Sequence, residues 1–302
     1  MRLATTLFLL LLLSAAPASA APHITGLDTV TTAGHPVNVR AKFEAGFGFW
    51  GLRPDLRHKP VLFQPLQGGP GHVLSAITDR DGVGEAEFRA DVPGVYRFRA
   101  ALVTKPWKSA VSRVWVLDPA KPVVVLDIDG TLSSMTELLV PFMGARAHTY
   151  PGAPELVRQL ATTHQIIYLT ARDDALDKGT RAFLKRQGFP DAPILYNDTG
   201  LWTKEEFRQL IGKGHGEFKL KTLQGLQSRG VNLVLGLGNA ETDAFAYEGA
   251  GIPSMIRTTQ VAAGSSFRFT DYTAQLRPQL VGLGFLPASG AGIAQAVGSN
   301  NP

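Results

Sequence analysis

Two aspartates, Asp127 and Asp129, directly follow a run of four apolar residues, Val123 to Leu126. Three of these four residues are β-branched, which predicts a strand buried on both faces, as at the centre of a parallel sheet. Because side chains alternate along an extended chain, both carboxylates leave the strand on the same side. They would lie at its carboxyl end, where open α/β sheets bind ligands. Paired hard oxygen ligands of this kind suit Mg²⁺ that also holds a substrate phosphate.

Polar side chains also follow this pair and a second predicted strand. Gly130 permits a sharp turn, and Thr131 supplies a hydroxyl. Thr170 ends the apolar run 166–169 and can donate a hydrogen bond to a phosphate oxygen beside the first carboxylate. Arg172 has two roles open to it, a clamp on the phosphate or a structural pair with an acid.

Two later segments supply a cation and further oxygens. Lys219 begins a predicted helix, where it would neutralise the first carboxylate and a bound phosphate. Lys221 is its rival, and either lysine taken alone is explained as a surface residue. Asn239 and Asp243 follow a strand that ends in glycines and lie four positions apart, on one helix face. A dinucleotide-binding interpretation of these glycines fails because position 241 is Glu.

The elements that must position these residues alternate between strands and amphipathic helices. This alternation predicts an α/β fold with a doubly wound, Rossmann-like parallel sheet and right-handed crossovers. Only 32 residues, 133 to 164, separate the first motif from the second strand, which predicts a minimal cap and a site open to large or membrane-embedded substrates. The expected strands are Val123–Asp127, Gln165–Leu169, Ile194–Tyr196 and Val231–Leu235, and the expected helices are Ala153–Thr163, Asp177–Gln187, Thr203–Ile211, Phe218–Ser228 and Ala240–Gly249.

The preceding residues, 21–118, have a different pattern of short β-rich runs separated by turns. This pattern predicts a small all-β sandwich. The run from Asp91 to Tyr96 resembles the approach to the penultimate strand of immunoglobulin-like domains, where the tyrosine packs at a corner. The expected strands are Val37–Phe43, Val61–Phe63, Gly84–Ala90, Gly94–Leu102 and Ser109–Leu117.

One segment of this half interleaves aromatic residues with glycines and precedes a basic cluster. Such a loop could enter a membrane interface, with its rings inward and its cations toward lipid phosphates. Trp107, between Lys105 and Lys108, could belong to the same surface. The alternative is that these rings belong to the core of the sandwich. The segment contains Phe43, Phe47, Phe49, Trp50 and Leu52, followed by Arg53, Arg57, His58 and Lys59.

The two ends of the chain predict segments outside both domains. Residues 1–20 combine Arg2, an apolar run from Leu7 to Leu13 and a small-residue site, which predicts a signal peptide cleaved after Ala20; the alternative is a retained anchor. No later apolar run is long enough to cross a bilayer, so we expect a secreted or periplasmic protein. Residues 286–302, rich in Gly, Ala and Ser, predict a flexible tail after the α/β domain, which we expect to cover 122–285.

Composition excludes several other classes. The chain has no cysteine, which rules out disulfides, thiolate metal sites and a cysteine nucleophile. The formal net charge is +5, and it becomes +4 without Arg2. This balance is compatible with phosphorylated substrates or an anionic membrane surface, and nothing in the pattern indicates nucleic-acid binding.

The signature D-x-D-G-T after an apolar strand resembles the first motif of the haloacid dehalogenase superfamily of phosphohydrolases. Across about Val123 to Thr258 the order of motifs is similar to the catalytic domain of the lipins and the related LNS2 domains. The lipins usually have Ser where this chain has Thr170, and their characteristic amino-terminal domain is not seen here. The motifs that carry the similarity are 127–131, 168–172, 179–184, 218–220 and 238–247.

The resemblance implies a mechanism and a set of roles. Asp127 would attack phosphorus and form an aspartyl-phosphate, and Asp129 would act as acid and then as base. Mg²⁺ would be held by Asp127, the backbone carbonyl of Asp129 and Asn239, with Asp243 as a ligand or as a support behind the ligands. Thr170 and Lys219 would complete the phosphate cradle. The substrate would also lie against Gly130, Thr131, Ala171 and Arg172.

These inferences lead to an expected function. We expect an exported, Mg²⁺-dependent hydrolase similar to phosphatidate phosphatases, acting on a phospholipid or another phosphomonoester, with a possible peripheral contact to a membrane. One alternative is an exported acid phosphatase for soluble phosphomonoesters. The other is a phosphatidate-binding module without turnover, against which the intact pair Asp127 and Asp129 counts.

Overall fold

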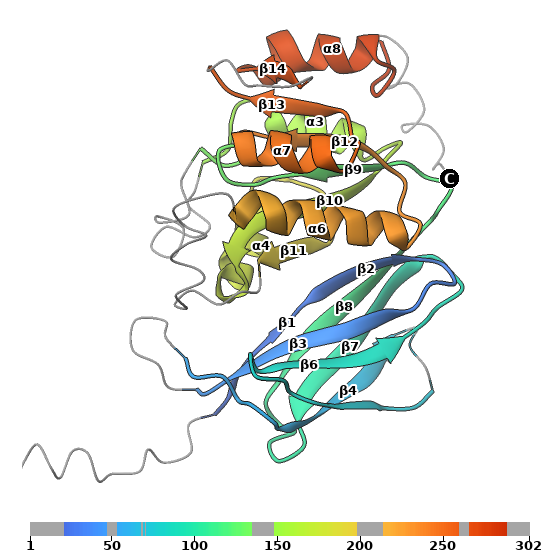
Figure 1. The fold of residues 1–302 in the computed structure, drawn as a ribbon, viewed down its shortest axis with the longest axis vertical. Helices are drawn as coiled ribbons and strands as arrows, with labels where there is room; N and C mark the ends of the chain where they lie inside the picture. Colours follow the sequence, from blue (N-terminus) through green and yellow to red (C-terminus); the bar gives the residue numbers. More distant parts are fainter. Residues whose placement is uncertain are drawn as a thin grey trace, which may run out of the picture.

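The computed structural model describes residues 21–46, 53–67, 69, 71–134, 148–197, 214–259 and 266–288. Residues 21–118 form strands only, and residues from 122 onward form a layered α/β unit above them (Figure 1). The predicted signal peptide, the aromatic positions 47–52, the helix expected at 203–211 and most of the tail lie outside the described residues, as do residues 135–147 of the segment expected to form the cap. No helix in the described part is long and apolar enough to cross a membrane.

The amino-terminal half contains two sheets. A three-stranded sheet has the order β1-β3-β6, and a five-stranded sheet has the order β2-β8-β7-β4-β5, with every pair antiparallel except β2 and β8. The strands are β1 (His23–Gly26), β2 (Asp28–Thr32), β3 (Val37–Glu44), β4 (Pro60–Gln67), β5 (Leu74–Ile77), β6 (Val83–Phe88), β7 (Gly94–Leu102) and β8 (Ser109–Leu117).

One apolar cluster joins these two sheets face to face. Phe43 and Phe88 from the smaller sheet pack against Phe63 and Phe98 from the larger one. Phe43 is fully buried, so this ring belongs to the core and not to an exposed aromatic loop. The Tyr96 hydroxyl donates to the carbonyl of Val92 at 2.8 Å, which is the local contact expected of a tyrosine at a corner.

Strands β1, β2 and β5 were not predicted. Gly26 interrupts the alternation of apolar and polar residues where β1 ends and β2 begins, and β5 follows a glycine-rich stretch. Neither region therefore shows the period of two that predicts a strand. Gly26 is required there, because a Cβ would lie 2.1 Å from the Val111 carbonyl oxygen. Close approach of two backbones, which is invisible in a local pattern, therefore decides this part of the sheet.

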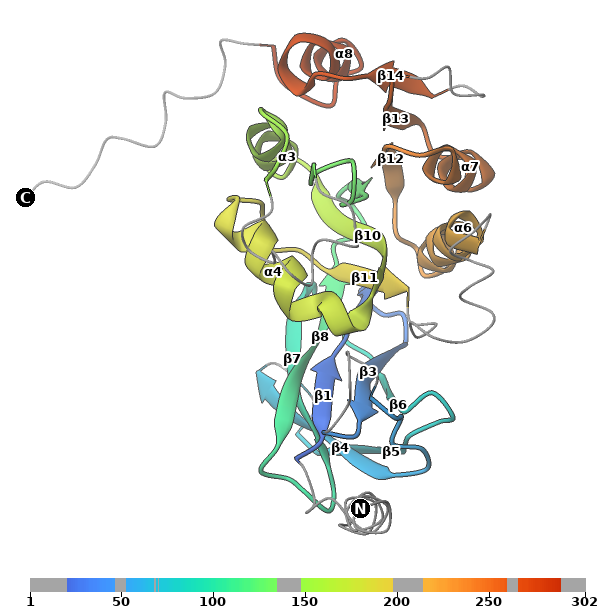
Figure 2. The same ribbon diagram turned by 90° about the vertical axis from the view of Figure 1, so that its left-hand side faces the viewer.

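The carboxyl-terminal unit is a six-stranded sheet in which every pair is parallel, in the order β11-β10-β9-β12-β13-β14. Helices cover both faces, which confirms the predicted doubly wound α/β class (Figures 1 and 2). The strands are β9 (Val123–Leu126), β10 (Gln165–Asp173), β11 (Ile194–Asn197), β12 (Leu233–Gly238), β13 (Ser254–Arg257) and β14 (Phe267–Phe269); the helices are α3 (Ala153–Leu160), η3 (Asp174–Leu176), α4 (Asp177–Arg186), α6 (Gly214–Ser228), α7 (Glu241–Gly249), η4 (Tyr272–Leu276) and α8 (Arg277–Gly282).

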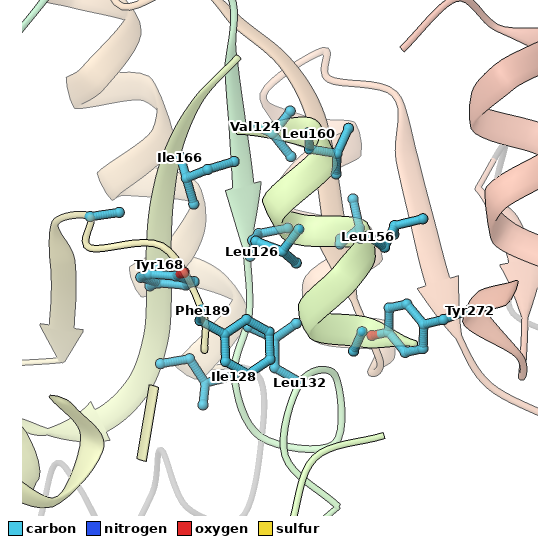
Figure 3. Close-up of a cluster of buried hydrophobic side chains, with 14 of the residues drawn as sticks. Val124, Leu126, Ile128, Leu132, Leu156, Leu160, Ile166, Tyr168, Phe189 and Tyr272 are labelled. Carbon is cyan, nitrogen blue, oxygen red and sulfur yellow. The ribbon is translucent and has the colours of Figure 1, made fainter. Parts of the chain in front are cut away.

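The central strand β9 has its side chains divided between two cores. Val124, Leu126 and Ile128 face the core under α3, together with Leu156 and Tyr272 (Figure 3). Val123 and Val125 face the opposite core under α6 and α7. All four strand residues are at most 1% exposed, as predicted for a strand buried on both faces. Burial of this kind fixes the register of β9 and with it the position of the two aspartates.

A buried ion network connects the two halves of the chain. Asp28 of β2 accepts two hydrogen bonds from Arg113 of β8 and pairs with Arg181 of α4 at 3.0 Å. The same carboxylate accepts the backbone N–H of Ile194 at 3.0 Å. Val30 of β2 and Leu117 of β8 belong to the core under α6. The halves therefore share both apolar contacts and charged contacts.

A second acidic group at this junction is buried without a cation of its own. Asp174 is 6% exposed, and its Oδ2 atom has no hydrogen-bond partner among the described residues. Burial, reinforced by the neighbouring Asp173 carboxylate, raises the pKa of Asp174 well above its usual value, although Lys42 opposes this. Asp174 therefore stays protonated in the folded chain at a pH where it is ionised in the unfolded chain.

This difference predicts how stability depends on pH. Above the unfolded pKa of 3.8, the folded state keeps a proton on Asp174 that the unfolded state loses. The contribution of Asp174 to the free energy of unfolding therefore falls as the pH rises from 3.8 through the pKa of the folded state. Asp174→Asn should weaken the decline in the free energy of unfolding between acidic and mildly alkaline pH, measured by urea denaturation. Asp91→Asn, whose side chain is 81% exposed, is the matched control and should leave the decline unchanged. Equal slopes for all three proteins would contradict the prediction.

Candidate active site

The turn after β9 holds the first aspartate at the edge of the sheet. The backbone N–H of Asp127 donates to the Leu237 carbonyl at 2.9 Å, which joins the end of β9 to the end of β12. Gly130 has a φ of 72° and donates to the Ser133 carbonyl at 2.8 Å. A Cβ at this position would lie 2.1 Å from the Asn239 side-chain nitrogen. Glycine is thus required both for the backbone angle and for the close approach of Asn239.

The carboxylate of Asp127 is held from both of its oxygens. Lys219 donates to Oδ1 at 2.7 Å, and the Thr131 hydroxyl donates to Oδ2 at 2.8 Å. Burial raises the pKa of Asp127 to about 7; Lys219 opposes that rise and Asp243 adds to it. The structure thus brings together Asp127, Thr131 and Lys219, all predicted from sequence.

Lys219 lies between two buried carboxylates. Its ammonium is 2.7 Å from Asp127 and 2.5 Å from Asp243. Burial alone would lower the pKa of Lys219, but the two carboxylates outweigh it and raise that pKa. Lys221 is exposed, so the structure selects Lys219 from the two candidates. Helix α6 begins at Gly214 and not at Phe218, which places Lys219 in its second turn and corrects the prediction that this lysine begins the helix.

Asp243 has both carboxylate oxygens engaged by protein groups. Oδ1 accepts from Lys219, and Oδ2 accepts the backbone N–H groups of Asn239 and Ala240 at 2.9 and 3.1 Å. The second set of contacts caps the start of α7. Of the two roles predicted for Asp243, the geometry matches support of Lys219 and Asn239, and direct metal ligation stays a prediction.

Asp129 forms a two-pronged ion pair with Arg172. The Nε and Nη2 atoms of Arg172 donate to the two oxygens of Asp129 at 2.6 and 2.7 Å. Arg172 also donates through Nη1 to the Thr180 hydroxyl at 2.9 Å, and its side chain is 0% exposed. Of the two roles predicted for Arg172, the structure shows the pair with an acid, and the contact with substrate phosphate stays a prediction. The planar guanidinium explains this choice, because it matches both oxygens of a carboxylate at once.

The remaining two predicted residues follow Leu169 in β10. Thr170 is buried, and its hydroxyl oxygen accepts the backbone N–H of Arg172 at 3.2 Å. This contact leaves the hydroxyl proton of Thr170 for a second partner, as a phosphate contact needs. Ala171 is partly exposed beside it. Both residues lie at the carboxyl end of a strand adjacent to β9, in the predicted place.

The oxygens of this site fit a hard divalent cation. The Thr131 hydroxyl is 2.8 Å from Asp127 Oδ2 and 3.4 Å from Asn239 Oδ1, so these two predicted ligand oxygens converge. The three aspartates Asp127, Asp129 and Asp243 exceed the two cations Lys219 and Arg172 by one negative charge. Hard oxygens with an excess of negative charge suit Mg²⁺. Within the described ranges no group of three or more acidic or histidine side chains is arranged to hold a metal, so this donor set would depend on Asn239 and on backbone oxygen.

Sequence reasoning missed two residues that support the site. Thr180 of α4 orients Arg172, and the Tyr272 hydroxyl donates to the Thr131 carbonyl at 2.6 Å. Thr180 lies within the lipin-like run 179–184, so the sequence marked this segment as similar but did not indicate what Thr180 does. Tyr272 carried no signal, because it lies 141 residues from Thr131 and only the fold brings them together.

The fold and the acid pair at the end of its central strand resemble those of haloacid dehalogenase α/β domains. Comparison with family models is more specific: residues 124–257 match the LNS2 domain of PITM 1-3. This confirms the resemblance inferred from the motifs. No curated protein matches the chain.

Solved structures give partial alignments. The chain is 18% identical to a chain of the Pnkp1/Rnl/Hen1 RNA repair complex, with a TM-score of 0.36 over 48% of this chain and 43% of that chain. It is 13% identical to D,D-heptose 1,7-bisphosphate phosphatase from B. bronchiseptica, with a TM-score of 0.37 over 54% of this chain and 99% of that one. A haloacid dehalogenase superfamily hydrolase from Geobacter sulfurreducens is 15% identical, with a TM-score of 0.34 over 51% and 96%. This chain thus spans less than half of the first of these structures.

Proposed function

We propose that the protein is an exported, Mg²⁺-dependent phosphatase that acts on phosphatidate or a similar lipid phosphate. One observation carries the proposal: Asp127 lies at the end of the central strand, held by Lys219 and Thr131, with Asp129 two residues further on. A buried carboxylate in this setting is shielded from water and fixed in direction, as a nucleophile requires. The amino-terminal half is proposed to be an immunoglobulin-like domain that positions the active site at a membrane.

The proposed reaction has two displacements. An oxygen of Asp127 forms a bond to phosphorus while the ester P–O bond breaks, and the departing oxygen takes a proton from Asp129. Water then gives a proton to Asp129 and displaces phosphate from Asp127. Mg²⁺ bound by Asp127, Asn239 and the Asp129 carbonyl would supply charge neutralisation at the phosphate oxygens. Lys219 and the Thr170 hydroxyl would hold the phosphate.

The substrate is tested by release of inorganic phosphate from phosphatidate vesicles and from a soluble aryl phosphate, each with Mg²⁺ and with EDTA. Mg²⁺-dependent release that is much faster from vesicles would support the lipid proposal. Release that is as fast or faster from the aryl ester would favour the general phosphatase instead. The match to an LNS2 domain favours the lipid, because the resemblance links that family to phosphatidate.

One observation favours a second function, phosphatidate binding without turnover. Arg172 donates hydrogen bonds to both oxygens of Asp129. Asp129 can therefore deliver a proton only if Arg172 releases at least one of these oxygens. The LNS2 domains of phosphatidylinositol-transfer proteins, which this chain resembles, bind phosphatidate without hydrolysing it. Those domains have lost part of the acidic motif, whereas this chain keeps both aspartates. Saturable binding to phosphatidate vesicles with no phosphate release from either substrate would establish this second function.

The amide at position 239 predicts how tightly the metal binds. Asn239→Asp adds a negative charge beside Asp127 and should increase Mg²⁺ affinity about tenfold in the absence of phosphate. Calorimetric titration of Mg²⁺, with and without orthovanadate as a phosphate analogue, measures this change, and the gain should shrink when the analogue is present. Asn232→Asp, at an exposed position, is the control for added charge. Equal Mg²⁺ affinity in all three proteins would remove Asn239 from the metal site.

A further inference from the structure

One end of the larger β-sheet gathers three chain segments, residues 53–60, 77–82 and 103–108, which we call the distal tip. Pro60 pairs with Ile77 across β4 and β5, and Val61 pairs with Leu102 across β4 and β7. Val103 donates its backbone N–H to the Pro60 carbonyl at 3.0 Å. Strand pairing therefore places Ile77, Pro60 and Val103 in neighbouring positions, and the β7–β8 turn that contains Trp107 follows directly.

The distal tip exposes large apolar side chains. Trp107 is 76% exposed, Ile77 is 69% exposed and Val103 is 45% exposed. Trp107 is the most exposed of the large hydrophobic residues in the described part of the chain. A protruding tryptophan beside aliphatic side chains is typical of surfaces that enter the interface of a bilayer, where the indole ring is favoured. Large apolar side chains that are exposed at neighbouring positions are typical of a contact surface.

The charge around these side chains is basic. The three segments of the distal tip contain six cationic residues and three acidic ones. Two of the acids are already engaged: Asp55 pairs with Lys42, and Asp79 accepts the backbone N–H groups of Asp81 and Val83. The cationic residues are Arg53, Arg57, Lys59, Arg80, Lys105 and Lys108. Cations around an apolar centre complement a surface of anionic lipids.

The distal tip and the active-site edge both lie away from the linker between β8 and β9. Strand β8 leads away from the tip over nine residues, about 30 Å, before the linker to β9, so the tip is the end farthest from that linker. In Figure 1 the β7–β8 turn lies at the lower end of the molecule, and α6, which runs opposite to the parallel strands, begins on the left. The carboxyl ends of those strands therefore face left, above the tip. Arg53 and Lys108 of the tip and Lys178 of α4 all act on His23, whose pKa burial and these charges lower.

We propose that the distal tip is a membrane-docking surface that inserts Trp107, Ile77 and Val103 into a bilayer of anionic lipids, with its lysines and arginines at the headgroups. This contact would hold the protein, and with it the active site, at the membrane surface. The inference rests on the proposed function for its purpose, since a lipid phosphate is reached only at the bilayer. The surface itself is tested by vesicle binding, which does not need turnover.

The test uses the mature protein and flotation with vesicles of phosphatidylcholine, alone or mixed with phosphatidylglycerol. Binding should require phosphatidylglycerol. Trp107→Ser should weaken it about tenfold, because one buried indole is lost, and Trp107→Phe should restore most of it. The pair Lys105→Glu and Lys108→Glu should weaken it at least tenfold. Quenching of tryptophan fluorescence by brominated lipid should fall in Trp107→Phe.

Matched controls distinguish vesicle binding through the distal tip from nonspecific apolar or electrostatic binding elsewhere on the surface. Phe245→Ser removes a ring that is 50% exposed on α7, and Lys185→Glu with Lys121→Glu reverses two exposed charges elsewhere. Both controls should bind vesicles like the wild type, and hydrolysis of soluble aryl phosphate should be unchanged in the tip variants.

Each result decides the proposal. Absence of vesicle binding by the wild type, equal binding to neutral vesicles, or tip variants that bind like the wild type would overturn it. Loss of vesicle binding in the tip variants of a protein that hydrolyses no ester would support the docking surface and overturn the proposed phosphatase activity.

Discussion

Asp127→Asn is expected to abolish phosphate release, by a factor on the order of 10⁴ or more, while the protein stays folded. The amide keeps the size and shape of the side chain and still accepts a hydrogen bond from Lys219, but it cannot form the covalent phosphoryl intermediate. The measurement is Mg²⁺-dependent release from the better of the two substrates, lipid vesicles or aryl phosphate.

Stability distinguishes this loss from misfolding. Because burial raises the pKa of Asp127 to about 7, an ionised carboxylate is costly at this position, and a neutral amide removes that cost. We therefore expect the free energy of unfolding of Asp127→Asn to equal or exceed that of the wild type at pH 8. The matched control is Asp91→Asn, which should keep full activity. Substantial turnover by a folded Asp127→Asn protein would remove Asp127 as the nucleophile.

Lys219→Met is expected to cause the largest loss of stability of any single substitution in the site. The ammonium of Lys219 contacts Asp127 and Asp243, both nearly inaccessible to water. Removing it leaves two buried carboxylates without a cation, which costs about 4 kcal/mol. The measurement is urea denaturation at neutral pH without added metal, and phosphate release should also be lost.

Lys221 provides a close control for this substitution. It lies two residues further along α6 and is exposed, so Lys221→Met should change the free energy of unfolding by about 0.5 kcal/mol or less. Adding Asp243→Asn to Lys219→Met should recover part of the lost stability, because one of the two unpaired charges is then removed. Equal stability of Lys219→Met and Lys221→Met would show that the ion pairs with Asp127 and Asp243 contribute little.

The pair of Asp129 and Arg172 connects the site to the rest of the fold. Arg172 is oriented by Thr180 of α4, and the next residue, Arg181, pairs with Asp28 of the β-rich half at 3.0 Å. The position of Asp129, the proton-transferring residue of the proposed mechanism, thus depends on α4, which contacts both halves of the chain. The amino-terminal half contacts the helix that supports the active site, in addition to its proposed contact with the membrane.

Local pattern was sufficient to predict the central strand and the position of its two aspartates. The β-branched run before Asp127 predicts a doubly buried strand, and a strand of this kind has one carboxyl end at which Asp127 and Asp129 must lie. The same argument predicted Thr170 beside them, and the spacing of Asn239 and Asp243 predicted a helix start at the end of a strand. These inferences held because each depends on a few neighbouring residues whose backbone geometry is fixed by burial.

Tertiary structure decided which groups pair. Arg172 could face a phosphate or an acid, and only the packed position of Asp129 43 residues earlier shows that it binds the acid. The sequence did not distinguish Lys219 from Lys221, and only the packing of α6 against β10 and α7 shows which of the two is buried. Strands β1 and β2 likewise depend on the backbone contact of Gly26 with Val111. Partners far apart in the chain are chosen by packing and by the cost of leaving a buried charge unpaired, and neither is visible in a local pattern.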